Sequence, residues 1–454
     1  MATTVAEKFA ALAEAQPEIL ARHWTGAGEA QLAIVAWQRA GEDADARGAL
    51  KEAEQDFRQA LAMVTTLAAS PERDGRELAL VAVLPWLLVR TKGYSASETI
   101  EVTEHARALA EKTGNLPQLI LQVIGTYAAV FVLGDYSGAA ALADQLLDLA
   151  QREGSNMSLI IAHVAQVNVR FNRGDLVGLE EHFACLGSLV EAAERGQFAG
   201  PIANGIATSM GYASLGAWIL GHAEKARGRI AQAIAFARDQ PFLLAGGRTF
   251  ESYLRRWFRE PQRAADAAVE AVAISEQHGF SFTRDSSRII LGWARAQLGN
   301  PGEGVALIRQ GMAGFAGTGA RADTTNARTI LAEAQALDGE IEAALITLDE
   351  ALRANPEELV FRPNILKWRG ELRIRIGQNE PAEADFREAL ALAQNMSAKA
   401  WELRATTSLA RLLAKQGRRD EARAMLADIY NWFTEGFDTA DLKDAKALLD
   451  QLRG

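Results

Sequence analysis

Cysteine is almost absent from this chain of 454 residues. The one thiol, Cys185, cannot form an internal disulfide, so nothing in the sequence indicates an oxidising compartment. The two most apolar stretches, residues 78–89 and 119–133, fall short of the roughly 20 residues that a membrane-spanning helix requires. The N-terminus lacks the charged start and apolar core of a signal peptide. These absences predict a cytoplasmic protein.

Motifs for catalysis and for nucleotide or metal binding are also missing. The sequence contains no G-x-x-x-x-G-K-[ST] phosphate loop, and no two of its six histidines have the i, i+4 spacing of metal ligands on a helix. Asp and Glu outnumber Lys and Arg by 58 to 48, and the net charge of −10 argues against a nucleic-acid partner. We therefore expect no enzyme activity, no metal and no cofactor.

The chain does have helical periodicity with regularly spaced breaks. Apolar residues make up 49% of the sequence and recur mostly at helical spacing. The regularly spaced breaks between helical stretches contain a glycine in every case but one, and Arg259-Glu260-Pro261 occupies that remaining position of the series. A fixed period of roughly 20–50 residues in a helical sequence predicts a solenoid of stacked helix pairs. The glycines lie about 40 residues apart in most cases and are Gly134, Gly174, Gly221, Gly299, Gly339, Gly377 and Gly417.

Most units repeat one packing pattern around the turn glycine. After Gly377, a small residue follows at position five, a large one at nine and a small one at twelve, namely Ala382, Phe386 and Ala389. These three positions share one face of the second helix of the pair. Gly370, seven positions before the turn, is also small and lies on the first helix. The pattern predicts that paired helices approach closely, with the large residue between them.

Small, large, small after a Gly-Asp-Tyr turn is the tetratricopeptide pattern, and Gly134-Asp135-Tyr136 matches that turn. The chain thus resembles a tetratricopeptide-like array, which implies an all-α, right-handed superhelical solenoid of antiparallel helix pairs. We expect N-terminal helices over residues 1–30 and a continuous solenoid of roughly ten helix pairs over 31–434. Residues 435–454 are expected to form a C-terminal capping helix with a polar outer face.

Three segments resemble a narrower family. Residues 16–24 (QPEILARHW) with 36–41 (AWQRAG), residues 91–94 (TKGY) and residues 429–442 (IYNWFTEGFDTADL) are similar to one kind of tetratricopeptide arm. That arm is the C-terminal part of bacterial signalling proteins that also contain a class III nucleotide cyclase and an AAA (STAND-type) ATPase. Their catalytic modules precede the arm, and this sequence begins where the arm begins. The resemblance implies a regulatory arm in signal transduction, either as a free-standing protein that has a cyclase or ATPase module as its partner in trans or as a piece of a larger protein.

The first helix of each pair usually lines the concave, binding face of such a solenoid. Its inward positions here are aromatic in mid-chain and basic towards the C-terminus. Tyr, Trp and Arg dominate binding hot spots, and a basic groove suits the carboxylates of an acidic peptide. We therefore predict a non-catalytic scaffold that binds a protein or acidic peptide through Trp218, Arg256, Trp257, Trp293, Lys367, Arg404, Arg411 and Lys415.

The sequence also allows other roles for these residues and for the chain. The tryptophans could instead fill the packing between long helices, and the basic row could be solvated surface charge. A different function is that of a small-ligand sensor, in which a metabolite fills the groove and changes the pitch of the superhelix. The long step from Gly174 to Gly221, with Gly196, Gly200 and Pro201, could form a hinge or lid for that purpose.

Overall fold

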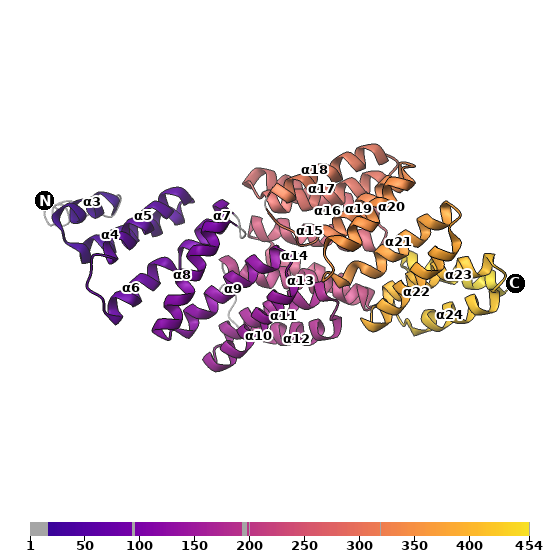
Figure 1. Ribbon diagram of the computed structural model, residues 1–454, viewed down its shortest axis with the longest axis horizontal. Coiled ribbons are helices and arrows are strands. Elements are labelled where there is room, and N and C mark those ends of the chain that lie inside the picture. The colour runs from indigo at the N-terminus through magenta and orange to yellow at the C-terminus, as the bar shows by residue number, and fades with distance from the viewer. Residues whose placement is uncertain (1–16, 93–95, 193–197, 199, 318, 454) are drawn as a thin grey trace. The chain divides into compact units, whose positions relative to one another are not determined.

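The computed structural model describes residues 17–92, 96–192, 198, 200–317 and 319–453 (Figure 1). These residues form helices joined by turns, and none of them lies in a β-strand, which confirms the predicted all-α solenoid of helix pairs. Over the same ranges, every helix is too short or too polar to cross a membrane. Residues 1–16 of the expected N-terminal segment lie outside the described residues, as do Gly93, Tyr94 and Gly196.

The helices form two compact units, and each is described by itself. The first unit comprises residues 1–132 and 145–158, and the second comprises 133–144 and 159–454. The single solenoid predicted over 31–434 therefore stays a prediction. The helices of the first unit are α3 (Pro17–Ala27), α4 (Ala30–Ala46), α5 (Leu50–Val64), α6 (Pro71–Val81), α7 (Leu84–Lys92), α8 (Ser97–Thr113) and α9 (Leu116–Val132).

Helix α10 (Tyr136–Glu153) contributes residues to both units. The second unit then continues as paired helices to the C-terminus, where α25 stands alone. Its helices are α11 (Asn156–Arg173), α12 (Leu176–Ala192), α13 (Gly200–Ile219), α14 (Ala223–Ala237), α15 (Pro241–Trp257), α16 (Pro261–His278), α17 (Ser281–Gln297), α18 (Pro301–Gly317), α19 (Thr324–Leu337), α20 (Ile341–Ala354), the 3₁₀ turn η1 (Leu359–Phe361), α21 (Arg362–Arg375), α22 (Asn379–Asn395), α23 (Lys399–Lys415), α24 (Arg419–Trp432) and α25 (Ala440–Arg453).

All seven predicted turn glycines lie between consecutive helices. Their φ angles run from 75° to 99°, the left-handed region in which a Cβ is disfavoured, so glycine ends each first helix at little conformational cost. The predicted replacement slot is also confirmed, because α15 ends at Trp257 and α16 begins at Pro261. Arg259 adopts a φ of 60° there, the same backbone conformation with a side chain attached.

The small–large–small register brings paired helices into close contact. Ala382, Phe386 and Ala389 are fully buried. A Cβ added to Gly370 would lie 2.5 Å from the Phe386 ring, so only glycine leaves room for that ring. Gly292 lies as close to the backbone of α18, where an added Cβ would lie 2.6 Å from a carbonyl oxygen. Shape, rather than polar bonding, therefore fixes each pair.

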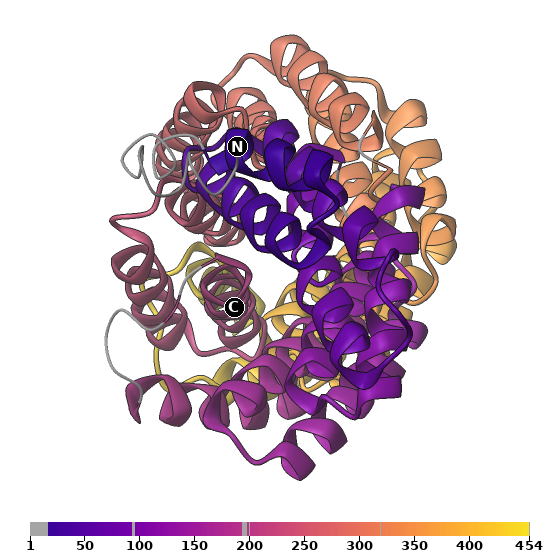
Figure 2. The ribbon, with the colours of Figure 1, turned by 90° about the vertical axis from the view of Figure 1, so that its left-hand side faces the viewer.

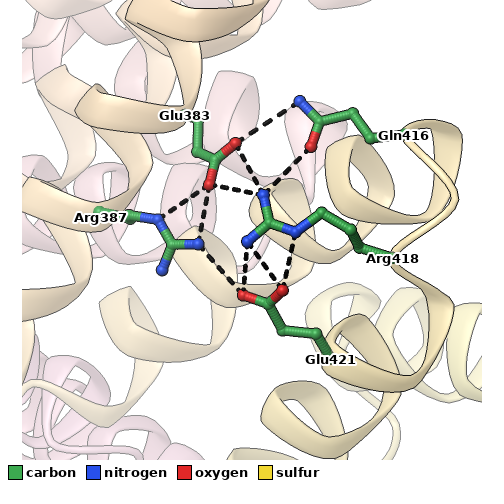
Figure 3. A network of polar contacts seen from close by, with 5 residues as sticks. All are labelled: Glu383, Arg387, Gln416, Arg418 and Glu421. Carbon is green, nitrogen blue, oxygen red and sulfur yellow. Dashed lines mark hydrogen bonds and ion pairs between the residues drawn. The ribbon is translucent and has the colours of Figure 1, made fainter.

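The outward face of α22 is charged (Figure 3). Glu383 accepts hydrogen bonds from Arg387 at 2.7 Å and from Arg418 at 2.9 Å, and Gln416 lies 3.5 Å away. Arg418 also pairs with Glu421 at 2.7 Å. This network joins α22 to α24 and to the turn before it. Exposed ion pairs of this kind are screened by water and add little stability, so they support a contact that apolar packing already makes.

The second unit winds back on itself, and its helices follow one another around a ring in Figure 2. The Asn355 side chain donates a hydrogen bond to the Gly134 carbonyl at 2.8 Å, across 221 positions of sequence. Arg227 pairs with Asp438 across 211 positions. The unit therefore brings its C-terminal helices against its early ones, a contact that no local repeat pattern reveals.

Candidate functional site

A cavity of about 380 Å³ lies within the second unit. Five successive first helices, α15, α17, α19, α21 and α23, contribute to its lining, and α25 contributes from the C-terminus. The predicted concave face is thus where this cavity lies. Its lining residues are Arg256, Trp257, Arg259, Pro261, Trp293, Gln297, Glu333, Lys367, Trp368, Glu371, Arg404, Thr407, Ser408, Arg411, Asp441 and Asp444.

The cavity brings together most of the residues that the sequence singled out. Trp218 instead lines a smaller neighbouring cavity of about 20 Å³. Lys415 is exposed at the last position of α23 and lines neither cavity. The predicted residues in the lining are Arg256, Trp257, Trp293, Lys367, Arg404 and Arg411.

Two of the predicted tryptophans belong to a buried aromatic cluster. The Trp218 ring lies 5.2 Å from Trp257 and 4.9 Å from Trp401 between centroids, and Trp257 lies 5.4 Å from Trp401. All three side chains are at most 4% exposed. Trp218 and Trp257 therefore pack helices α13, α15 and α23 together, which is the packing role that the sequence left open.

The third tryptophan belongs to a polar part of the wall. Glu333 accepts a hydrogen bond from the Trp293 indole at 2.8 Å and a second one from the Arg256 guanidinium. Arg256 is buried, and its Nε has no hydrogen-bond partner among the described residues. A buried donor without an acceptor costs about 1–3 kcal/mol, and this Nε atom is too buried to meet a ligand in the cavity.

The predicted basic row is largely neutralised by acids that share the cavity. Lys367 pairs with Glu371 at 2.8 Å, and its ammonium lies 4.0 Å from the centre of the Trp368 ring. Arg404 pairs with Asp441 at 2.8 Å and stacks on Trp218 and Trp401. The row is therefore not a continuous positive surface, in contrast to the simple expectation from the sequence.

One cation of the lining differs from the others. Arg411 is exposed and makes no ion pair within the described part of the chain. The remaining four cations each pair with a carboxylate of the same lining, among them Arg259 with Asp444 at 2.6 Å. Arg411 is thus the lining cation best placed to meet a charged group from outside the chain.

The carboxylates of α25 were missed by the sequence analysis. The polar face of the capping helix was expected to face solvent, yet Asp441 and Asp444 line the cavity. Their partners, Arg404 and Arg259, stand 37 and 185 positions earlier. Only the regular three-residue spacing of acids before and within α25 hinted at a shared role.

A buried acidic pair adjoins the cavity lining. Glu358 accepts hydrogen bonds from the Tyr136 hydroxyl at 3.1 Å and from the Asp323 backbone N–H at 2.8 Å. Asp323 accepts one from the Tyr253 hydroxyl at 2.7 Å. Burial raises the pKa of Glu358 to about 7 and the pKa of Asp323 to about 6, and the nearby Asp323 charge raises that of Glu358 further. Through these hydrogen bonds the pair joins α10, α15, α19 and η1. At pH 7 its two carboxyl groups carry less negative charge than two ionised carboxylates would.

His163 and His182 form a second contact that the sequence analysis missed. Their Nδ1 atoms lie 2.9 Å apart, so one ring donates a hydrogen bond to the other. Burial lowers the pKa of His163 and lowers that of His182 to about 4, so both rings are neutral at pH 7. No group of three or more His, Cys, Asp or Glu residues that could hold a metal ion occurs in the described ranges.

Comparisons with known proteins show the fold of this chain and name no partner for it. No family model matches this chain. An uncharacterised protein of Rhizobium meliloti (strain 1021) is 22% identical over 411 residues, which cover 88% of this chain. The chain spans 39% of the length of that relative.

Solved structures of helical repeat proteins also match this chain, among them the following two. A Rap protein complexed with competence and sporulation factor aligns over 83% of this chain and 99% of its own, with a TM-score of 0.56 and 12% identity. NprR in complex with its cognate peptide NprX aligns over 64% of this chain and 82% of its own, with a TM-score of 0.44 and 13% identity. The Rap likeness shows that the fold is a tetratricopeptide-like one.

Proposed function

We propose that this chain is a regulatory arm that binds a protein or peptide partner in the cavity of its second unit. The observation that carries the proposal is a cavity lined by five successive first helices, in which Arg411 has no ion-pair partner among the described residues. Acidic side chains of a partner would meet Arg411 while Trp293 and Trp368 supply aromatic surface.

The setting we propose is bacterial signalling inside the cytoplasm. Residues 429–442 resemble the arm of cyclase and ATPase proteins, and the chain corresponds to 39% of a longer relative. Both observations support an arm that works with another module, and a cyclase or ATPase is the candidate. The Rap protein, which has a similar fold, was solved with a factor bound, and this supports a binding function rather than catalysis.

The experiment compares two cations near the end of α23. Arg411 lines the cavity and Lys415 does not, although both are exposed and neither makes an ion pair within the described ranges. We expect Arg411→Glu to weaken binding of the partner recovered by cross-linking from native cytosol about tenfold or more, because a like charge then faces its carboxylates. Lys415→Glu is the matched control and should change affinity less than about threefold.

Equal effects of the two reversals would contradict the proposed site. Arg404 is a poor choice for this test, although the sequence suggests it. Its guanidinium lies between Trp218 and Trp401 and donates a hydrogen bond to the Trp257 carbonyl, so reversal would disturb the packing itself.

A small-ligand sensor is the second candidate, because about 380 Å³ lies within the usual range of small-molecule sites. A metabolite that binds there should raise the melting temperature in proportion to ln(1 + [L]/Kd). A thermal-shift screen in which no metabolite raises it, together with a protein recovered by cross-linking, would favour the first candidate.

A further inference from the structure

Four acidic residues near the C-terminus contact the opposite side of the second unit. They lie three positions apart, at Glu435, Asp438, Asp441 and Asp444, and we call residues Glu435–Asp444 the acidic segment. The Glu435 carboxylate accepts a hydrogen bond at 3.0 Å from the Glu224 backbone N–H, in the first turn of α14. An anion is favoured there because unpaired N–H groups make the start of a helix positive.

The other three carboxylates each pair with an arginine. Asp438 lies 2.8 Å from Arg227, and Asp441 lies 2.8 Å from Arg404. Asp444 lies 2.6 Å from an Nη of Arg259, and the same nitrogen lies 3.5 Å from Asp441. Every acid of the segment is therefore held by α14, by the α15–α16 turn or by α23, and none is left to solvent alone. These partners are Glu224, Arg227, Arg259 and Arg404.

These contacts are separate from those that fix α25 as the capping helix. The apolar face of α25 buries Leu442, Ala445 and Leu449 in a core that also contains Leu413 and Leu426. That core anchors the helix on its own neighbours, α23 and α24. The acids lie away from it and contact residues as far as 211 positions earlier, so packing of the cap alone does not require them.

Arg259 supports a specific purpose for these contacts. The seven turns predicted from the sequence have glycine at this slot, whereas Arg259 adopts the same left-handed φ with a side chain that disfavours it. A strained residue persists where its side chain makes contacts that compensate for it. Its guanidinium contacts Asp441 and Asp444, the two acids of the segment that line the cavity.

We propose that the acidic segment is a built-in occupant of the partner site, and that the partner which displaces it presents carboxylates with the same three-residue spacing. This inference rests on the proposed function, because it assumes that the cavity is where the partner binds. Its basis is that Asp441 and Asp444 already place carboxylates on cavity arginines. The chain thus shows, in cis, the chemistry that its cavity accepts.

Two of the three ion pairs are suited to exchange, and the third, between Arg404 and Asp441, is more buried, with side chains that are 14% and 15% exposed. The side chains of Arg227 and Asp438 are 26% and 62% exposed, and those of Arg259 and Asp444 are 48% and 43% exposed. Exposed pairs of this kind are weak and are screened by salt. A partner with the same charges could therefore replace them one at a time, while the apolar core of α25 stays in place.

The probe for the test is a fluorescein-labelled peptide of residues 433–444, FTEGFDTADLKD, and its affinity is measured by anisotropy. It is added to the full chain, either unmodified or carrying Asp438→Asn, Asp441→Asn and Asp444→Asn. We expect the triple variant to bind the peptide at least about tenfold more tightly, because its own segment no longer competes for the arginines. Adding Arg259→Gln to the triple variant should remove most of that gain.

Two controls isolate charge and position. A neutral peptide, with Gln and Asn in place of its four paired acids, should bind neither protein. Asp450→Asn changes an exposed acid of α25 whose ion-pair partners among the described residues, Lys446 and Arg453, lie in the same helix, and it should leave peptide affinity unchanged. Equal binding of the acidic peptide by the unmodified chain and the triple variant would overturn the inference, as would equal binding of the neutral peptide.

If the triple variant does not fold, a second measurement tests the inference without it. In the unmodified chain, amide hydrogen exchange of residues 441–445 should speed up several-fold between low and high salt, and Arg259→Gly should speed it up at low salt. Unchanged exchange in Arg259→Gly would also overturn the inference. If the inference fails while Arg411→Glu still weakens the recovered partner, the proposed function stands on its own.

Discussion

The helix pair α4–α5 of the first unit and the pair α21–α22 of the second follow one plan with one difference. In each pair a turn glycine of positive φ is followed at position nine by a buried phenylalanine, Phe57 or Phe386. In each, that ring lies against a glycine of the first helix, Gly41 or Gly370, where a Cβ would be 2.8 or 2.5 Å from the ring. The apolar plan is shared between the two pairs.

The difference lies in a buried aspartate beside each phenylalanine. Asp385 pairs with Arg369 at 2.6 Å and with Arg373 at 2.7 Å. The two equivalent positions opposite Asp56 are alanines, and Asp56 has no ion pair among the described residues. Burial, together with the charge of Glu52, raises the pKa of Asp56 to about 6. Apolar shape therefore sets the register of both pairs, and the polar positions beside it vary without changing the fold.

The largest expected effect tests the shared part of the comparison. Phe57→Ala and Phe386→Ala should each lower the free energy of unfolding by about 3–5 kcal/mol, because each removes a fully buried ring that fills the space over a glycine. Urea denaturation followed by circular dichroism measures the change. The exposed Leu32 of α4 is the control, and Leu32→Ala should change the free energy by about 0.5 kcal/mol or less.

The second prediction tests the difference. Asp385→Asn leaves Arg369 and Arg373 facing a neutral group, so it should lower the free energy of unfolding by about 2–3 kcal/mol at pH 7. Arg369 retains Asp349 at 2.8 Å, which limits the loss. The same urea titration reports it, and a change below about 0.5 kcal/mol would mean that the two ion pairs add little to this helix pair.

The third prediction has the smallest effect on stability, and here the substitution stabilises the protein instead of destabilising it. The folded pKa of Asp56, about 6, lies above its ordinary value of 3.8, so folding favours the protonated acid. The stability it contributes is present below about pH 4 and is lost as the pH rises to about 6. Asp56→Asn should therefore raise the melting temperature at pH 7 by about 2–4 °C. That gain should shrink towards zero at pH 4, and a gain independent of pH would rule out the carboxylate as its cause.

The turns and the packing register could be predicted from the sequence because both depend on residues close together in the chain. Gly377, Ala382 and Phe386 lie within ten positions, and the structure places them as their spacing indicates. The pair α4–α5 has the same register around Gly48, a turn glycine that is not among the seven predicted from the sequence. A count at positions five, nine and twelve after Gly48 gives Ala53, Phe57 and Ala60, and would have revealed it.

The candidate site was only half predictable. Helical spacing placed Arg256, Trp293 and Arg411 on the concave face, and they line the cavity. Lys367 pairs with Glu371 on its own helix, but the other neutralising charges come from α25 and α19, and Asp444 stands 185 positions after its arginine. A local period gives the repeat but not the number of repeats in one superhelical turn, so the facing partners stay hidden in the sequence.

Arg259 also matters to anyone who would redesign this scaffold. A consensus design that averages the repeats would replace it with the glycine found at the other turns, and relief of the left-handed backbone would favour the change by about 1 kcal/mol. The same edit would cut the link between the α15–α16 turn and α25. A thermostability screen would therefore select against the residue that couples this turn to the C-terminal helix, so an engineered version should be judged by binding as well as by melting temperature.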